Sequence, residues 1–107
     1  MMFQKYPYEE RYRYFQFRRS DYQDGLSVSP PEYLVASGSP SDLSVVCTDK
    51  DGNDCSSSMI SSVQIYMSTQ VMYLLKGGDS GKTYTITIKA TTNLGQKLEA
   101  VVQVGVI

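Results

Sequence analysis

The clearest hydrophobic pattern in the chain lies near its end. From Tyr84 to Ala90 every second residue is apolar, and threonines or a lysine stand between these positions. The following stretch, KLEAVVQVGVI, repeats the alternation from Leu98 to Val106. A period of two residues is typical of a β-strand with one buried face. We therefore predict two strands joined through Asn93–Gln96 into a hairpin.

Shorter apolar stretches in the middle of the chain predict further strands. SDLSVVC (41–47), SVQIY (62–66) and QVMYLLK (70–76) are each bounded by polar residues, and Ser68-Thr69 is the expected turn between the last two. Gly77–Gly81 is predicted to be a loop, because glycine adopts backbone conformations that other residues avoid. Three more strands and their connections are thus expected before the hairpin.

The front of the chain holds two weaker strand candidates. In LSVSPPEYLVAS, residues 26–37, the pair Pro30-Pro31 cannot donate to a central sheet ladder, so an edge strand or an irregular extended segment is expected. YRYFQFRR, residues 12–19, alternates as well and is the candidate first strand. No stretch has a sustained helical period. Six or seven short strands predict an all-β fold, a two-sheet immunoglobulin or fibronectin-III-like sandwich.

Length and composition narrow the function. A chain of 107 residues fits one domain with a single core, and no apolar run approaches the ~18 residues of a membrane span. The first residues lack the pattern of a secretory signal, so we expect a protein that stays in the cytoplasm where it is made. Histidine is absent, which removes the commonest general base and zinc ligand. We therefore expect a non-enzymatic protein without a cofactor or metal.

Charge and aromatic residues divide the chain into two parts. Residues 1–19 hold five basic and two acidic residues, whereas residues 20–107 hold five basic and nine acidic ones. Eight of the twelve aromatic residues lie within the first 22 positions. We predict a basic aromatic N-terminal arm at 1–22, which includes or precedes the first strand, followed by an Ig-like sandwich at 23–107.

The composition of the arm indicates protein binding. Tyrosine, phenylalanine and arginine are enriched at the energetic centres of interfaces. The predicted partner-binding residues are Tyr6, Tyr8, Arg11, Tyr12, Arg13, Tyr14, Phe15 and Phe17. The structural alternative is that this segment only completes the sheet of its own domain. Interleaved aromatics and arginines also suit single-stranded nucleic acid, but a small net charge beside an acidic body disfavours that partner.

The stretch CTDKDGNDC, residues 47–55, has the composition of a metal loop. A calcium loop needs acidic ligands at its first, third and fifth positions, then a glycine and a late glutamate. Asp49, Asp51 and Asp54 have the wrong order for this, and so we predict a tight turn in which Gly52 and its neighbours adopt positive φ. Cys47 and Cys55 are expected to be free thiols; a disulfide across the turn is the alternative.

The stretch GGDSGK is similar to a phosphate-binding loop only in composition. Gly81 follows Gly77 four places on instead of five, and a strand follows where that motif needs a helix. We predict a linking loop. Tyr84, at the head of the next strand, stands where sandwich domains place a tyrosine whose hydroxyl bonds to the backbone at the sheet edge.

The sequences SDLSVVCTDKDGNDCSSSMI and YLLKGGDSGKTYTITIKATTNLGQKLEAVVQVGVI together resemble a family of small tailed-bacteriophage virion proteins with an Ig-like sandwich. The resemblance covers roughly residues 40–107 and rests on the double-glycine loop, Tyr-Thr-Ile-Thr and the glycine-containing last turn. The arm departs from the family pattern, which carries a tryptophan there.

This resemblance implies a non-enzymatic structural protein of the virion. It implies an adaptor of the neck, tail or fiber region that docks onto other virion proteins, or onto a second copy, through its arm and sandwich surface. Such a protein is made in the host cytoplasm and resides in the particle. The alternative is an Ig-like binding module of a bacterial surface or secreted protein.

Overall fold

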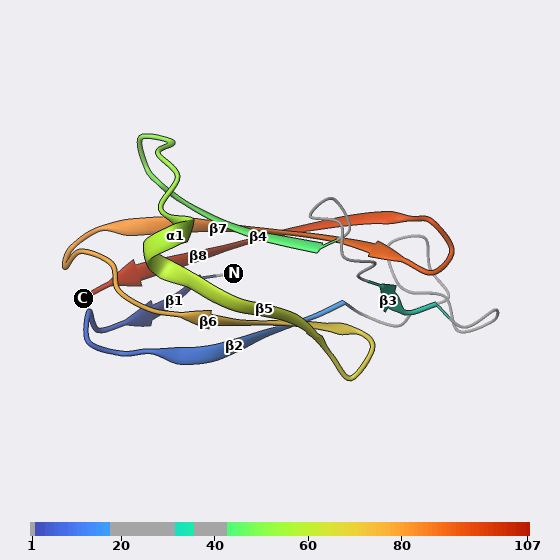
Figure 1. Ribbon diagram of the computed structural model, residues 1–107. Helices are drawn as coiled ribbons and strands as arrows, with labels where there is room; N and C mark the ends of the chain where they lie inside the picture. The colour runs from blue at the N-terminus through green and yellow to red at the C-terminus, as the bar shows by residue number, and fades with distance from the viewer. Residues whose placement is uncertain (1, 18–31, 36–42) are drawn as a thin grey trace.

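The structure is a computed structural model that describes residues 2–17, 32–35 and 43–107. In these residues, two β-sheets pack face to face and one short helix lies at an end of the sandwich (Figure 1). The elements are β1 (Met2–Lys5), β2 (Arg11–Gln16), β3 (Leu34–Val35), β4 (Leu43–Asp49), α1 (Ser56–Met59), β5 (Ile60–Tyr66), β6 (Gln70–Leu75), β7 (Thr83–Thr92) and β8 (Lys97–Val106). The all-β sandwich expected from the sequence is confirmed.

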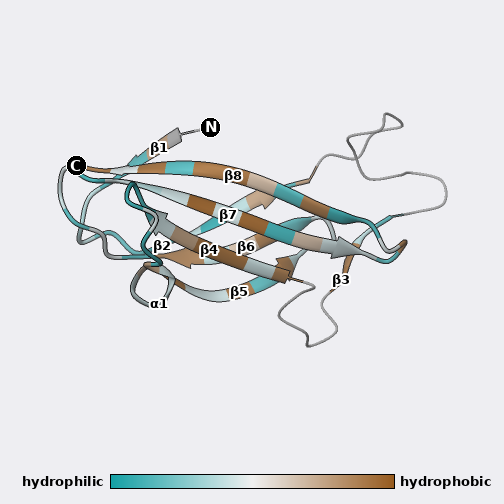
Figure 2. Cartoon of the chain, turned by 90° about the horizontal axis from the view of Figure 1, so that it is seen from above, coloured by the Kyte–Doolittle hydropathy of each residue, from teal (hydrophilic) through white to brown (hydrophobic). Residues whose placement is uncertain are grey.

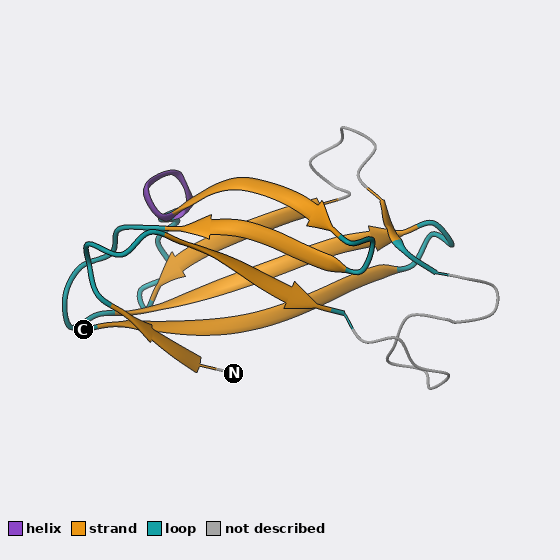
Figure 3. Ribbon diagram, turned by 90° about the horizontal axis from the view of Figure 1, so that it is seen from below, coloured by secondary structure: helices purple, strands orange, loops and turns teal. Residues whose placement is uncertain are grey.

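The described strands form two sheets, and six of them have an order that agrees with an immunoglobulin-type sandwich. One sheet contains β2, β6 and β5, and the other contains β1, β8 and β7, with β4 and β3 paired to successive lengths of β7 (Figure 3). Across one sheet the order β2-β6-β5 matches strands B, E and D of the immunoglobulin sandwich, and across the other the order β4-β7-β8 matches strands C, F and G. All described pairs are antiparallel except β1 with β8.

The hairpin of β7 and β8 has the register that the alternation predicts. Its pairs run from Thr83 opposite Gly105 to Thr91 opposite Lys97. Tyr84, Ile86, Ile88 and Ala90 are all buried, and the hydrophobic and polar residues alternate visibly along both strands (Figure 2). In the turn, Gly95 has a φ of 83° and donates a 3.0 Å hydrogen bond to the carbonyl of Thr92. The left-handed backbone explains why glycine stands there.

The core lies between the two sheets. The alternate residues of β6, led by Val71 and Tyr73, pack toward those of β7 and β8. The buried hydrophobic side chains are Phe17, Leu34, Val45, Cys47, Met59, Ile60, Val71, Tyr73, Leu75, Tyr84, Ile86, Ile88, Ala90, Val102, Val104 and Val106. Burial of each large apolar side chain stabilises the folded state by roughly 1.5 to 3 kcal/mol, so this layer supplies most of the driving force for folding.

The expected tyrosine at the sheet edge is present. The hydroxyl oxygen of Tyr84 accepts a 2.9 Å hydrogen bond from the backbone N–H of Asp79. Gly78 lies beneath this ring with a φ of 92°, and a Cβ there would meet Cγ2 of Val106 at 2.8 Å. The glycine loop between β6 and β7 therefore packs closely against the end of the sandwich, as a linking loop.

The stretch Cys47–Cys55 forms the predicted turn. Oδ1 of Asp49 accepts hydrogen bonds of 2.9 Å from the backbone N–H groups of Asp51 and Asn53, and Gly52 has a φ of 86°. The chain closes where Cys55 N–H donates to the carbonyl of Cys47 at 2.7 Å. Both cysteines are free thiols in the structure. The structure differs from the prediction in one detail: within this turn only Gly52 has a positive φ, and its neighbours do not.

The helix α1 was not predicted. Its single turn carries the chain from β4 in one sheet to β5 in the other (Figure 1). Four residues are too few to produce a helical period in a sequence, and the serines at its start give no apolar pattern. Its last residue, Met59, is buried in the core and fixes the crossing.

Of the proline-containing stretch, only residues 32–35 are described, and Pro30-Pro31 lie outside the described residues. Leu34 and Val35 form β3, which pairs with the end of β7 at the edge of its sheet. The expectation of an edge strand is confirmed for this part.

Candidate protein-interaction surface

The aromatic N-terminal stretch is extended and belongs to the sandwich. β1 pairs in parallel with β8, from Met2 opposite Gln103 to Lys5 opposite Val106. β2 pairs with β6, from Arg11 opposite Leu75 to Gln16 opposite Gln70. Residues 2–17 thus add one strand to each sheet. The domain boundary expected at residue 22 lies outside the described residues.

The alternation along β2 divides the predicted binding residues into two groups. Tyr12 and Tyr14 point away from the core and are 50% and 51% exposed. Arg13, Phe15 and Phe17 point toward the other sheet, where the rings of Phe15 and Phe17 lie 5.0 Å apart. Phe17 is buried in the core. A partner could reach Tyr12 and Tyr14 directly, whereas Phe17 supports the sheet beneath them.

Tyr12 and Tyr14 belong to an uncharged outer surface, here called the tyrosine face. It consists of the outward residues of β2, β6 and β5, which the strand register places side by side. These residues are Tyr12, Tyr14, Gln16, Ser61, Gln64, Tyr66, Gln70, Met72 and Leu74. Met72 is buried among these residues, and the exposed part is rich in tyrosine and glutamine. Depletion of charge together with enrichment of tyrosine is typical of the centre of a protein interface.

Tyr66 is a member of this surface that the sequence analysis missed. Its ring centroid lies 5.0 Å from that of Tyr14, in a tilted arrangement. The two residues are 52 positions apart in the sequence, and only the pairing of β2 and β5 with β6 brings them together. The one available signal was that Tyr66 occupies the outward position in the alternation of SVQIY.

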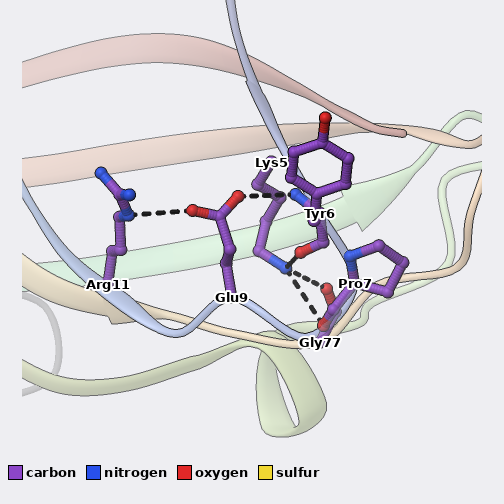
Figure 4. Close-up of polar contacts among 6 residues, drawn as sticks. All are labelled: Lys5, Tyr6, Pro7, Glu9, Arg11 and Gly77. Carbon is purple, nitrogen blue, oxygen red and sulfur yellow. Dashed lines mark hydrogen bonds and ion pairs between the residues drawn. The ribbon is translucent and has the colours of Figure 1, made fainter.

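The connection between β1 and β2, residues 6–10, is a second exposed feature, here called the tyrosine loop. Tyr6 N–H donates a 2.8 Å hydrogen bond to Oε1 of Glu9, and Glu9 N–H donates back to the Tyr6 carbonyl at 3.1 Å. Nε of Arg11 lies 3.0 Å from Oε2 of the same carboxylate (Figure 4). The hydrogen bond from Tyr6 and the charge of Arg11 lower the pKa of Glu9, against a smaller opposing effect of burial.

Lys5 anchors the tyrosine loop to the rest of the molecule. Its side chain is buried, and Nζ donates hydrogen bonds of 2.7 Å to the Tyr6 carbonyl and 2.6 Å to the Gly77 carbonyl (Figure 4). Burial is the main cause that lowers the pKa of this lysine. The loop is therefore held from both sides, by Lys5 beneath it and by Glu9 and Arg11 along it.

The two tyrosines of this loop are the part that a partner would meet. Tyr8 is 96% exposed and Tyr6 is 59% exposed, although the backbone that carries them is fixed. An aromatic side chain on a fixed backbone loses little conformational freedom when it is buried by a partner. Of the predicted binding residues, the structure thus exposes Tyr6, Tyr8, Arg11, Tyr12 and Tyr14.

Metal ligation has no support in the described residues. They contain no group of three or more His, Cys, Asp or Glu side chains that could hold an ion. The Asp49 carboxylate is used within its own turn, and burial raises the pKa of the Cys47 thiol to about 12. What the surface offers is aromatic area, amide groups and tyrosine hydroxyls, which suit molecular recognition.

Within the described residues no helix is long and apolar enough to cross a membrane, since the single helix has four residues. No protein-family model and no curated protein sequence matches this chain.

Proposed function

We propose that this protein is a non-enzymatic adaptor that docks onto another protein through the tyrosine loop and the tyrosine face. The observation that carries the proposal is the 96% exposure of Tyr8 on a loop that Lys5, Glu9 and Arg11 hold in place. Folding alone gives no reason to present a large aromatic ring to water on a loop whose backbone is held by hydrogen bonds and an ion pair. A partner that buries the ring supplies the reason.

The composition of the adjoining face supports the same conclusion. The tyrosine loop leads directly into β2, and β2 contributes Tyr12 and Tyr14 to the tyrosine face, so a single partner could cover both. Buried tyrosines at interface centres typically contribute about 1 to 2 kcal/mol each. Tyr6, Tyr8, Tyr12 and Tyr14 are therefore sufficient anchors for a specific contact.

The assembly in which the adaptor acts is the neck, tail or fiber region of a tailed-bacteriophage virion. The resemblance of residues 40–107 to small virion proteins supports this setting, and the Ig-type strand order agrees with it. The partners are then other tail, neck or fiber components, or a second copy of the chain. Repeated copies in a particle would strengthen a modest contact through multivalency.

The test uses a phage whose genome encodes the chain. The gene is deleted and supplied from a plasmid as wild type, as the double variant Y6A/Y8A, or as the control Y33A. Tyr33 is also an exposed tyrosine, 44% accessible, but it lies beside β3 and not on the proposed surface. Infectious particles are counted, and the protein content of purified particles is measured by mass spectrometry.

We expect wild type and Y33A to enter particles and restore infectivity, and Y6A/Y8A to fold but to be lost from particles. Thermal unfolding of the purified variants checks the folding. Absence of the wild-type protein from purified particles would refute the virion setting. Recovery of that protein in the cell envelope or medium would instead favour the surface-module alternative. Normal incorporation of Y6A/Y8A would refute the docking role of the loop.

A further inference from the structure

A cleft of about 420 Å³ opens between the edges of the two sheets. Its walls are Phe3 of β1, the four consecutive β2 residues 12–15, Tyr73 of β6 and Val102 of β8. Tyr73 and Val102 are core residues, so the floor of the cleft is the hydrophobic core itself. The cleft is distinct from the tyrosine loop, because none of the residues 6–10 line it.

The lining residues place the cleft along the edge of β2 that faces away from β6. Successive side chains of a strand point to opposite faces, so a hollow on one face touches only every second residue. This cleft touches all four residues from Tyr12 to Phe15 and must therefore lie beside the strand. β2 pairs with β6 on one side, and within the described ranges no strand pairs with its other side.

The opposite sheet also has an uncovered edge here. β1 pairs with β8 only from Gln103 to Val106, although β8 begins at Lys97. The edge of β8 before Gln103 has no strand beside it in the part of the chain that the structure describes. Unpaired edges offer backbone N–H and C=O groups that can accept another strand.

Arg13 supplies the charge of the cleft. Its Cζ lies 4.4 Å from the centroid of the Phe3 ring, and its Nε is buried without a hydrogen-bond partner. The ion pairs among the described residues use Arg11, Lys82 and Lys89, and none includes Arg13. A buried guanidinium nitrogen without an acceptor is costly to the folded protein, and a carboxylate would satisfy it with a charge-assisted hydrogen bond.

We propose that the cleft binds an extended peptide segment of a partner protein that carries an acidic side chain. The segment pairs with the free edge of β2 as an added strand, which supplies affinity through backbone hydrogen bonds. Its acidic side chain meets Arg13, and apolar side chains two residues to either side lie against the Phe3 and Phe15 rings. The charge of Arg13 sets the preference for an acidic residue, and the spacing follows from the period of a strand.

This inference goes beyond the proposed function, since it assigns a peptide-binding cleft that does not depend on the tyrosine loop or on a virion, although Tyr12 and Tyr14 of the tyrosine face also line it. The probe is the synthetic peptide acetyl-Thr-Val-Thr-Glu-Thr-Val-Thr-amide, in which the glutamate and both valines share one face of a strand. Its twin carries glutamine in place of glutamate. Each is titrated into the ¹⁵N-labelled full chain, and amide chemical shifts report affinity and location.

We expect the glutamate peptide to bind with shifts centred on the amides of Tyr12–Phe15 and Val102. The glutamine twin should bind at least tenfold more weakly. The variant R13Q should lose the same factor for the glutamate peptide. The variant K89Q removes one positive charge from the outer face of the other sheet and should keep wild-type affinity.

Several results would overturn the proposal. These are equal affinity for the two peptides, equal affinity of R13Q and wild type, shifts centred away from β2, or no binding at millimolar peptide. If R13Q does not fold, the comparison of the two peptides on the wild-type chain still tests whether the cleft prefers an acidic side chain. A chain that sediments as a dimer without peptide and does not bind the peptide would show that a second copy occupies the β2 edge, which also refutes the proposal.

Discussion

The ammonium group of Lys5 donates a 2.6 Å hydrogen bond to the carbonyl of Gly77, a residue 72 positions further along the chain. Lys5 ends β1 in one sheet, and Gly77 follows β6 of the other sheet. One buried side chain, 2% exposed, therefore ties the two sheets together at the end of the sandwich that carries the tyrosine loop.

Removal of this amine should destabilise the fold. In the variant K5M the aliphatic stem is kept, but the carbonyls of Tyr6 and Gly77 lose their common donor. We expect a loss of about 1 to 2 kcal/mol in the free energy of unfolding, because buried carbonyls are left unsatisfied and the gain from removing a buried charge offsets only part of this. Urea denaturation measures it, with the exposed Lys97→Met as control. Equal stability of the two variants would contradict the anchoring role.

The unpaired Arg13 predicts a substitution that stabilises the protein. The variant R13M keeps an apolar chain against the Phe3 ring and removes a guanidinium that has no acceptor at its buried Nε. We expect the free energy of unfolding to rise by about 1 kcal/mol, since a buried hydrogen-bond donor without an acceptor disfavours folding. Urea denaturation at neutral pH provides the measurement. A clear loss of stability would mean that the contact of the guanidinium with the Phe3 ring outweighs the cost of its unsatisfied Nε.

Two glycines of the β6–β7 loop should respond differently to substitution by alanine. Gly78 and Gly81 both have positive φ, but a Cβ at Gly78 would meet Val106 at 2.8 Å, whereas one at Gly81 has nothing within 4 Å. Gly81→Ala should cost about 1 to 2 kcal/mol from the backbone alone. Gly78→Ala adds overpacking of about 1 to 3 kcal/mol. Thermal unfolding of both variants tests the order, and a Gly81 variant as unstable as the Gly78 variant would refute this reading of the loop.

Two buried groups that lose a proton at high pH, the Cys47 thiol and the Tyr73 phenol, predict a loss of stability at alkaline pH. Burial raises the pKa of Cys47 from 9.0 to about 12 and that of Tyr73 from 10.0 to about 12. Between about pH 9 and 12 the thiol and the phenol of the unfolded chain lose protons that the native state retains. Their contribution to the free energy of unfolding is therefore fully present below about pH 9 and is lost as the pH rises toward 12. The lowered pKa of Lys5 acts in the opposite direction.

The variant C47A isolates the largest of these effects. It should unfold more easily than wild type near neutrality, because it leaves a cavity in the core. Its stability should fall less steeply above about pH 9, because the thiol contributes at most about 4 kcal/mol of pH-dependent stability in the wild type. Urea denaturation at several pH values provides the comparison. Parallel pH profiles for the two proteins would show that Cys47 is not responsible.

The sequence alone determined the parts of the fold that depend on local alternation. The residues Tyr84–Ala90 and Leu98–Val106 reveal their buried faces because a strand puts every second side chain on the same side, wherever that strand lies. The turn at Gly95 and the hydroxyl bond of Tyr84 follow from residue types at strand ends. The alternation of β2 likewise puts Tyr12 and Tyr14 on the face opposite to Phe15 and Phe17, but only the packing of the two sheets buries Phe17, which the sequence analysis placed among the binding residues.

The tertiary structure decided which strands meet. Pairing of β1 with β8, the bond between Lys5 and Gly77, and the contact of Tyr14 with Tyr66 each join residues more than fifty positions apart. The Nε of Arg13, which is buried without a hydrogen-bond partner, lies in a cleft formed by residues of both sheets. A local alternation of apolar and polar residues indicates that a strand has one buried face. Which other strand or sheet covers that face depends on how the whole chain buries its apolar surface. For this reason the tyrosine loop and the edge cleft appear only in the folded molecule.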